Sequence, residues 1–240
     1  MKSSWDKKAA NYSRYEGELN EFQKEFFDKL DKYGIDFKEK TLIDVGCGTG
    51  VKTLHLAKMC KNVTGLDLST KMLEVMSDDA RKFGISNLRI VESDWTSFKL
   101  DQIYDIAFST MSPAIATVED FDKFTSAGKQ RVYLWWNKPR NSDLINKFYE
   151  IYGERKGWFD RASGFEYHLQ MQKIPFKSEI IQEVRSKDLS LQEAYENVTW
   201  HLEIGEIKFD EKSLKNELEK QSINGKITET ISSSMKLLVF

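Results

Sequence analysis

The stretch Thr41-Leu-Ile-Asp-Val-Gly-Cys-Gly-Thr-Gly50 decides the fold of this chain. Its first five residues form a short apolar run, which is typical of a strand buried on both faces of a parallel sheet. Three alternating glycines follow directly, and Val51 to Cys60 then has the pattern of a helix. Glycines at such a strand-to-helix turn permit a tight bend and let the backbone approach a ligand closely.

Outward from this turn, strands and helices alternate. Residues 62–68, 88–92, 104–109 and 131–136 read as strands, and residues 70–83 as a helix that Gly84 closes. Before the turn, residues 12–33 carry apolar side chains at helical spacing. Strands that alternate with helices indicate βαβ units. The sequence therefore predicts an α/β fold, a doubly wound three-layer sandwich with a mostly parallel sheet.

The pattern after Pro139 is less regular. We expect helices at residues 143–152, 190–202 and 210–221, a loop at 153–164, and strands at 176–185 and 227–240. No low-complexity linker separates this part from the rest, so the sequence predicts one domain over residues 1–240. Its expected parts are a lid and helix (1–33), a cofactor-binding core (41–136), substrate-side additions (137–226) and a last strand (227–240).

The composition narrows the class of protein. Among 240 residues, 36 basic and 38 acidic side chains give a net charge of −2, which weighs against nucleic-acid binding without excluding it. The two cysteines, Cys47 and Cys60, form no metal-ligand cluster and predict neither a disulfide scaffold nor a metal site. Without an apolar run of membrane-spanning length, we expect a cytoplasmic protein without membrane contact, as a monomer or homodimer.

Two carboxylates distinguish between the cofactors that use such a turn. Asp67 ends the next strand, where it can accept hydrogen bonds from ribose hydroxyls. Asp44 precedes the first glycine, and a carboxylate there would repel the pyrophosphate of a nicotinamide dinucleotide. It suits a ligand that carries an ammonium group and a sulfonium. The spacing G-x-G-x-G, rather than G-x-G-x-x-G, also favours the methyl donor.

At this point the sequence resembles a known family. DVGCGTG (44–50) is similar to motif I of the class I S-adenosylmethionine-dependent methyltransferases, and GLDLS (65–69) to their second, acidic motif. ESDW (92–95) and YDIAFSTMSPA (104–114) resemble the third and fourth motifs. The resemblance covers about residues 5 to 136. It implies a seven-stranded sheet with an antiparallel last strand, S-adenosylmethionine as cofactor and S-adenosylhomocysteine as product.

The resemblance also implies which residues bind the cofactor. Gly46, Gly48 and Gly50 would pass beneath its methionine part, Asp44 would orient the amino group, and Asp67 would hold the ribose. Leu68 would pack on the adenine, Asp94 and Trp95 would contact its edge, and Ser109 would line the site near the sulfonium. Cys47 and Met72 join this set, and Trp5 and Tyr12 would fold over the donor as a lid. For Trp95, and for Trp5 with Tyr12, a purely structural packing role stays open.

The acceptor is less constrained. Residues 152–168 combine aromatic side chains with Arg155, Lys156 and Arg161, which favours a cover over a small organic acceptor. An RNA, tRNA or protein methyltransferase, or a non-catalytic donor-binding protein, remains the alternative. His168 and His201 are candidate general bases. No catalytic residue beyond these two is assigned.

Overall fold

The computed structural model describes residues 2–153, 157 and 160–240, which form two compact units. Unit 1 comprises residues 1–135, 161–180 and 236–240, and unit 2 comprises residues 136–160 and 181–235. The chain therefore passes between the units several times. The prediction of a single domain is not tested by this division and stays a prediction.

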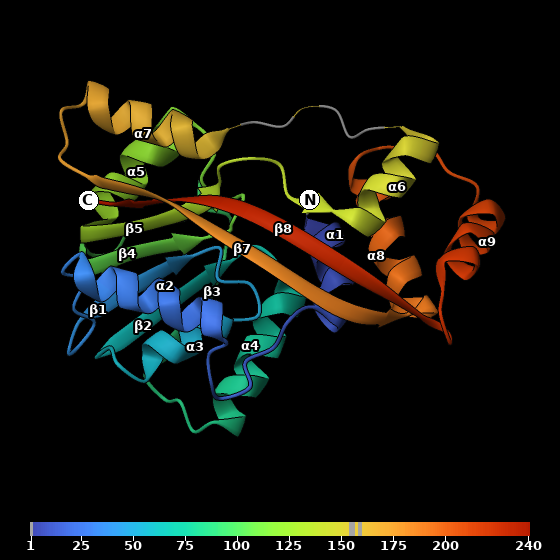
Figure 1. Ribbon diagram of the computed structural model, residues 1–240. Coiled ribbons are helices and arrows are strands. Elements are labelled where there is room, and N and C mark those ends of the chain that lie inside the picture. Colours follow the sequence, from blue (N-terminus) through green and yellow to red (C-terminus); the bar gives the residue numbers. More distant parts are fainter. Residues whose placement is uncertain (1, 154–156, 158–159) are drawn as a thin grey trace. The chain divides into compact units, whose positions relative to one another are not determined.

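The sheet of unit 1 is built around the strand that precedes the glycine turn (Figure 1). Its strands run in the order β3 (Leu88–Glu92), β2 (Asn62–Asp67), β1 (Thr41–Val45), β4 (Tyr104–Thr110), β5 (Gly128–Trp136) and β8 (Lys226–Val239). The first five are parallel to one another. Arg131 and Phe240 exchange backbone hydrogen bonds of 2.7 and 3.1 Å, which is the pairing of antiparallel strands.

Two further strands pair with β8. The long strand β7 (Lys177–Ser190) lies beside it, and the two-residue β6 (Asn141–Ser142) is antiparallel to it. Leaving out the short β6, the sheet has the seven strands that the sequence predicted, with an antiparallel last strand. The predicted α/β fold class is confirmed.

Helices cover both faces of the sheet in unit 1. Phe108 of β4 and Tyr133 of β5 point to opposite faces, since Phe108 is in register with Val132. Phe26 of α2 (Glu21–Lys32) packs against Phe108, whereas Phe124 of α5 (Val118–Ala127) packs against Tyr133. The remaining helices of this unit are α1 (Lys2–Lys8), η1 (Ala9–Asn11), α3 (Val51–Ala57), α4 (Thr70–Lys82) and α7 (Arg161–Met171).

Unit 2 has a core of its own. Its helices are α6 (Asp143–Tyr152), α8 (Leu191–Ile204) and α9 (Glu211–Gln221). Buried side chains from these helices, among them Phe148, Val198 and Leu214, pack together with Leu189 of β7 and Ile227 of β8. The helices therefore cover one face of the β7–β8 ribbon.

Several predicted boundaries were wrong. The helix expected from residue 12 begins only at Glu21, because Asn20 caps it and exchanges hydrogen bonds with Gln23, and Gly17 has a φ of 94°. The pattern did not single out α1 or α5. The loop expected over residues 153–164 ends earlier, since α7 begins at Arg161. Strand β7 extends to Ser190, five residues beyond its predicted end.

Candidate functional site

The three glycines of the turn after β1 are glycines for different reasons. All have positive φ, of 74°, 57° and 78° for Gly46, Gly48 and Gly50. A Cβ at Gly46 would lie 1.7 Å from Ser112 Oγ, and one at Gly50 would lie 2.4 Å from Met76 Cγ. A Cβ at Gly48 would meet no atom of the described chain within 4 Å. Packing thus demands the outer two, while Gly48 borders open space where a ligand can approach the backbone.

The turn is tied to the end of β2. The amides of Gly46 and Cys47 both donate to the carbonyl of Leu66, at 2.7 and 3.0 Å. The amide of Gly48 donates to Asp67 Oδ2 at 2.9 Å, and that of Ser69 donates to Asp67 Oδ1 at 2.8 Å. These bonds fix the Asp67 carboxylate beside the turn. Burial raises its pKa, and the two amide bonds offset part of that effect.

A cavity of about 270 Å³ opens at this point. It lies at the carboxyl ends of the parallel strands, where ligands bind in open α/β sheets. Its walls come from the N-terminal segment, the glycine turn and the segments after β2, β3 and β4. The lining residues are Trp5, Tyr12, Gly46, Gly48, Leu66, Asp67, Leu68, Met72, Ser93, Asp94, Trp95, Thr96, Met111, Ser112, Pro113, Ala114, Ala116 and Asp120.

Four residues predicted to bind the cofactor are not among the described residues that line this cavity: Asp44, Cys47, Gly50 and Ser109. Ser109 is fully buried and donates to the carbonyl of Val45 at 2.9 Å, so it joins β4 to β1. Burial raises the pKa of the Cys47 thiol well above its usual value, which disfavours the thiolate that a nucleophile needs.

Asp44 is a buried carboxylate at the end of β1, 3% exposed. The hydroxyl of Thr53, on α3, donates to its Oδ2 at 2.6 Å. Burial is the largest cause that raises the pKa of Asp44 to about 6, and the bond from Thr53 acts in the opposite direction. A cation bound near the turn would stabilise the ionised form of this group.

The N-terminal segment forms one wall of the cavity. The rings of Trp5 and Tyr12 meet edge to face with centroids 6.3 Å apart. Helix α1 buries no side chain, and polar contacts attach it: Asp6 accepts from Ser69 Oγ at 2.6 Å and from the Lys71 amide at 3.1 Å. The attachment of α1 therefore depends on these polar contacts, since none of its side chains is fully buried.

Asp94 and Trp95 line the cavity and also have structural partners. Asp94 Oδ1 accepts from the Ser97 amide at 2.8 Å, as in a capped turn. The ring of Trp95 is 1% exposed and stacks on Phe98, and its Nε1 donates to the Asp120 carbonyl at 3.4 Å. The packing role left open for Trp95 is therefore present in the structure, together with its place at the cavity wall.

Sequence reasoning assigned residues 104–114 to the fourth motif but named no site residue in the segment that follows β4. Met111 has a φ of 57° and lines the cavity with Ser112 and Asp120. Asp120 accepts from the amides of Ala116 and Thr117 at 3.1 and 3.0 Å, and Thr117 caps α5 in return. The spacing T-x-x-D at residues 117–120 is the signal that could have located this helix start and its buried carboxylate.

Neither candidate base gains support from its surroundings. His168 Nε2 lies 2.9 Å from Asp122 Oδ1, and its ring packs on Phe121, so it joins α7 to α5. His201 belongs to unit 2, where its Nε2 lies 3.4 Å from Arg140 Nη2. His168 does not line the cavity of unit 1 as far as the structure describes it. Both histidines stay predictions.

The aromatic cover expected over residues 152–168 falls partly outside the described residues, since Arg155, Lys156, Trp158 and Phe159 are not described. Phe165 is fully buried in the core of unit 1 and stacks on Phe121. Tyr167, in contrast, is 62% exposed.

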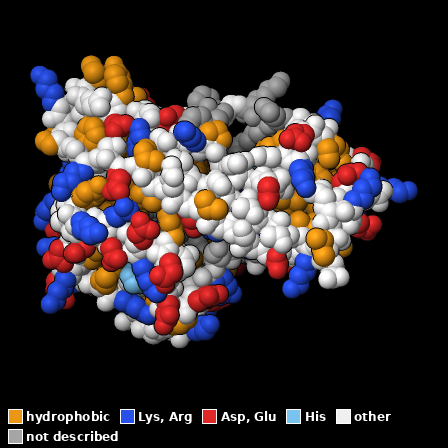
Figure 2. Space-filling model, viewed as in Figure 1, with side chains coloured by type: hydrophobic (Ala, Val, Ile, Leu, Met, Phe, Trp, Pro, Cys, Tyr) orange, Lys and Arg blue, Asp and Glu red, His pale blue; other side chains and the backbone are white. Residues whose placement is uncertain are grey.

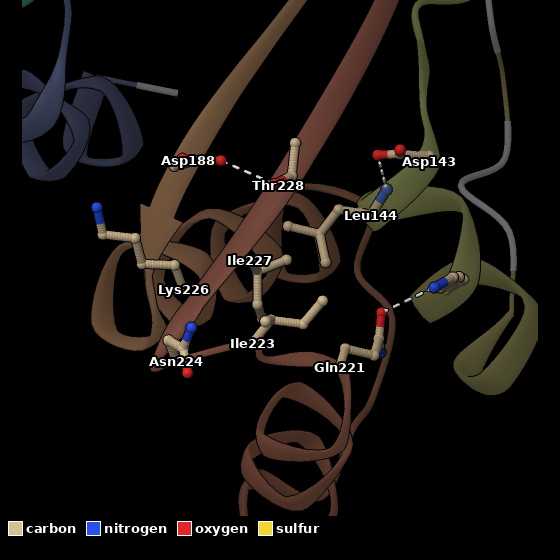
Figure 3. Close-up of a pocket in the computed structure, with 10 residues that line it drawn as sticks. Asp143, Leu144, Asp188, Gln221, Ile223, Asn224, Lys226, Ile227 and Thr228 are labelled. Atoms are coloured by element: carbon tan, nitrogen blue, oxygen red, sulfur yellow. Dashed lines mark hydrogen bonds between the residues drawn. The ribbon is translucent and has the colours of Figure 1, made fainter.

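A second cavity, of about 570 Å³, lies within unit 2 (Figure 3). Its lining combines the buried Leu144 and Ile227 and the exposed Ile223 with the charged residues Asp143, Lys147, Asp188 and Lys226. Asp188 accepts from Thr228 Oγ1 at 2.7 Å, and Asp143 from the Leu144 and Thr230 amides at 2.7 and 2.9 Å. The turn at this cavity, Asn224-Gly225, joins α9 to β8 rather than a parallel strand to a helix, so it differs from the turn at the first cavity.

Two further features are absent from the described residues. They contain no group of three or more histidine, cysteine or acidic side chains arranged to hold a metal ion. No helix among them is both long and apolar enough to cross a membrane.

Known proteins resemble this chain in sequence and in fold. Residues 36–173, more than half of the chain, match the model of a family described as a methyltransferase domain. Pavine N-methyltransferase from Thalictrum flavum subsp. glaucum is 34% identical over 88 residues, which cover 35% of this chain and 23% of that protein. Ubiquinone biosynthesis O-methyltransferase from Photorhabdus laumondii is 32% identical over 143 residues, covering 59% of this chain and 55% of that protein.

A solved structure agrees in fold. Coclaurine N-methyltransferase, bound to N-methylheliamine and S-adenosylhomocysteine, superposes with a TM-score of 0.53 at 14% identity, over 95% of this chain and 75% of that one. The match to each of the two curated relatives spans less than two thirds of that relative's length.

Proposed function

This chain belongs to the methyltransferase-domain family, in the class I group that uses S-adenosylmethionine, and on that premise we propose that it methylates a small organic molecule. The observation that carries the proposal is the turn at Gly48. Its backbone borders open space, and the adjacent Asp67 carboxylate is held in place by two amides. At such a turn, S-adenosylmethionine can bind in direct contact with the main chain, because no side chain intervenes.

The residues at the cavity fit this donor chemically. Asp67 retains lone pairs that can accept from the two ribose hydroxyls. Leu68 and Met72 supply an apolar surface for the adenine, and Asp94 supplies an acceptor at its edge. Trp5 and Tyr12 present aromatic rings, whose faces attract a sulfonium cation. Asp44, two residues before Gly46, supplies a buried carboxylate that would attract the ammonium group from outside the cavity lining.

When bound, the donor supplies a methyl group on a sulfonium that is already a good leaving group. The protein then has to hold the acceptor atom in line with the carbon–sulfur bond and to keep water out. A general base is needed only where the acceptor must lose a proton during transfer. The absence of an assigned base is therefore compatible with an amine that is already deprotonated.

Three observations support a small acceptor. The relatives named above are an alkaloid N-methyltransferase and a ubiquinone-pathway O-methyltransferase. The net charge of −2 supplies no general attraction to nucleic acid. On the face drawn in Figure 2, acidic and basic side chains are interspersed rather than gathered into one basic patch. A cytoplasmic location is part of the proposal, supported by two cysteines that remain free thiols.

The test is a transfer assay with methyl-labelled donor and a cell extract separated into small molecules, RNA and protein. We expect the label to appear in the small-molecule fraction, and we expect Asp67→Ala to abolish this transfer. A matched control is Asp188→Ala, which removes a carboxylate from the cavity of unit 2 and should leave transfer unchanged. Label in RNA or protein would contradict the proposal of a small-molecule acceptor. Donor binding without any transfer would contradict the proposal that the chain is an active methyltransferase.

A further inference from the structure

Strand β7 has an unpaired edge. In the described part of the chain β7 pairs with β8 alone, so its other edge presents free backbone amides and carbonyls. In unit 2 this edge runs from Ile181 to Ser190, and residues 184–188 are exposed. Val184 in its middle is 72% exposed, although valine is a residue that packs well in sheets.

The two faces of this ribbon differ. Leu189 is buried on the face that the helices of unit 2 cover, and Lys187 lies 3.7 Å from the buried Glu229 on the same face. Because side chains alternate along a strand, Glu183 and Arg185 belong to this face and Val184 to the opposite one. Neither Glu183 nor Arg185 has an ion-pair partner in residues 2–153, 157 and 160–240.

The sequence of this edge is complementary to itself. If a second copy pairs antiparallel about a two-fold axis at Val184, Glu183 of each copy lies opposite Arg185 of the other. In the same register Val184 faces Val184, Gln182 faces Ser186, and Ile181 faces Lys187. Opposite charges placed directly across a strand pair stabilise the pairing, as do β-branched pairs.

Neighbouring registers lack this match. An axis at Glu183 places two glutamates opposite each other, which is destabilising. An axis at Arg185 pairs Glu183 with Lys187, but it places two arginines opposite each other, and Lys187 already lies 3.7 Å from Glu229. A shift of one residue would turn the helix-covered face of one copy to the opposite side of the joint sheet. In the register centred on Val184, the helix-covered faces of the two copies lie on the same side of the joint sheet, and Glu183 of each copy lies opposite Arg185 of the other.

We propose that the unit 2 part of β7 is a dimerisation edge, on which a second copy of this chain pairs antiparallel about Val184. The dimer would complete the backbone hydrogen bonds of an exposed strand and remove a site of uncontrolled association.

Charge reversal tests the proposal, with sedimentation equilibrium as the readout. We expect a reversible dimer whose dissociation constant rises at least about tenfold in Glu183→Arg and in Arg185→Glu, since each creates like-charge pairs across the axis twice. The double variant exchanges the two charges and should restore the wild-type constant. Glu203→Arg, on an exposed position of α8, makes the same change of net charge as Glu183→Arg and should have no effect.

Cross-linking tests the register separately. Val184→Cys should form a disulfide-linked dimer under mild oxidation, whereas Val118→Cys, an exposed valine of α5, should not. A chain that stays monomeric at all concentrations would overturn the proposal and leave the edge to another occupant. So would a dimer whose stability neither single reversal changes.

Discussion

Gly46 and Gly48 have the same kind of backbone in the same turn, but their side-chain hydrogens face different surroundings. At Gly46 the surroundings are Ser112, and at Gly48 they are open space. A methyl group at Gly48 therefore costs the strain of a positive φ but displaces no protein atom. It would occupy the space that we assign to the donor.

We expect Gly48→Ala to lower donor affinity at least tenfold while it lowers the free energy of unfolding by only about 1 kcal/mol, the cost of a left-handed alanine. Gly84→Ala is the matched control, since Gly84 also has a positive φ, of 66°, with no neighbour within 4 Å. It should cost similar stability and leave donor affinity unchanged. Calorimetric titration and urea unfolding measure the two effects, and equal affinities in the two variants would contradict the assignment.

The buried Asp44 gives donor binding a pH dependence. Its pKa of about 6 means that the carboxylate gains a proton as the pH falls from 7 to 5. The donor's ammonium group stays charged over this range. The electrostatic attraction therefore weakens only because the Asp44 carboxylate loses its negative charge. We expect donor affinity to fall below pH 6 and to be level between pH 6.5 and 7. An affinity that is unchanged down to pH 5 would contradict the role of Asp44.

The same group should destabilise the free protein at neutral pH. Because the folded pKa is above the unfolded one, the folded state binds the extra proton, and stability rises as the pH falls from 7 towards 4. Asp44→Asn removes the buried charge, keeps an acceptor for Thr53, and should stabilise the free protein at pH 7 by about 1 to 3 kcal/mol. It should also weaken donor binding.

Asp79→Asn is the contrasting control, since Asp79 is buried but bonded to Arg14 at 2.6 Å. Loss of that partner should destabilise the protein, and urea unfolding compares the two variants. If Asp44→Asn has a lower free energy of unfolding than the wild type, the proposed cost of burying the Asp44 charge is wrong.

At the scale of elements, the N-terminal wall is expected to move. Helix α1 is attached by polar contacts through Asp6 and buries no side chain. We expect Asp6→Ala to lower donor affinity several-fold with little change in Tm, because the wall carrying Trp5 and Tyr12 loses its anchor on α4. Lys7→Ala, at an exposed position of the same helix, should behave as wild type. An unchanged affinity in Asp6→Ala would show that these aromatics are only packing.

Elements with a strong local signal could be predicted from the sequence. The strands of unit 1 were located because each is a short apolar run, and the turn because its glycines follow one of them. Helix α1 could not be found in this way, since it has no apolar face, and β7 extends through residues whose exposed side chains do not alternate in polarity. Met111 and Asp120 were not named as site residues, because Met111 lies in a turn that no periodicity describes and Asp120 lies at the start of α5, a helix that the pattern did not single out.

On the scale of the whole molecule, neither compact unit is a continuous segment. The chain crosses between them within β5, β7 and β8, which belong to both. These three strands are therefore complete only when both units are folded. We expect one cooperative unfolding transition in urea, with the same midpoint by fluorescence and by circular dichroism, as for a single domain. Two separated transitions would contradict the prediction of one domain.

The central claim is that the turn at Gly48 and Asp67 binds S-adenosylmethionine. Calorimetric titration of the purified chain with this donor and with S-adenosylhomocysteine tests it most directly, with Asp67→Ala and Asp188→Ala beside the wild type. We predict micromolar binding of both ligands, lost in Asp67→Ala and retained in Asp188→Ala. Binding of a nicotinamide dinucleotide, with no affinity for either sulfur ligand, would contradict the account.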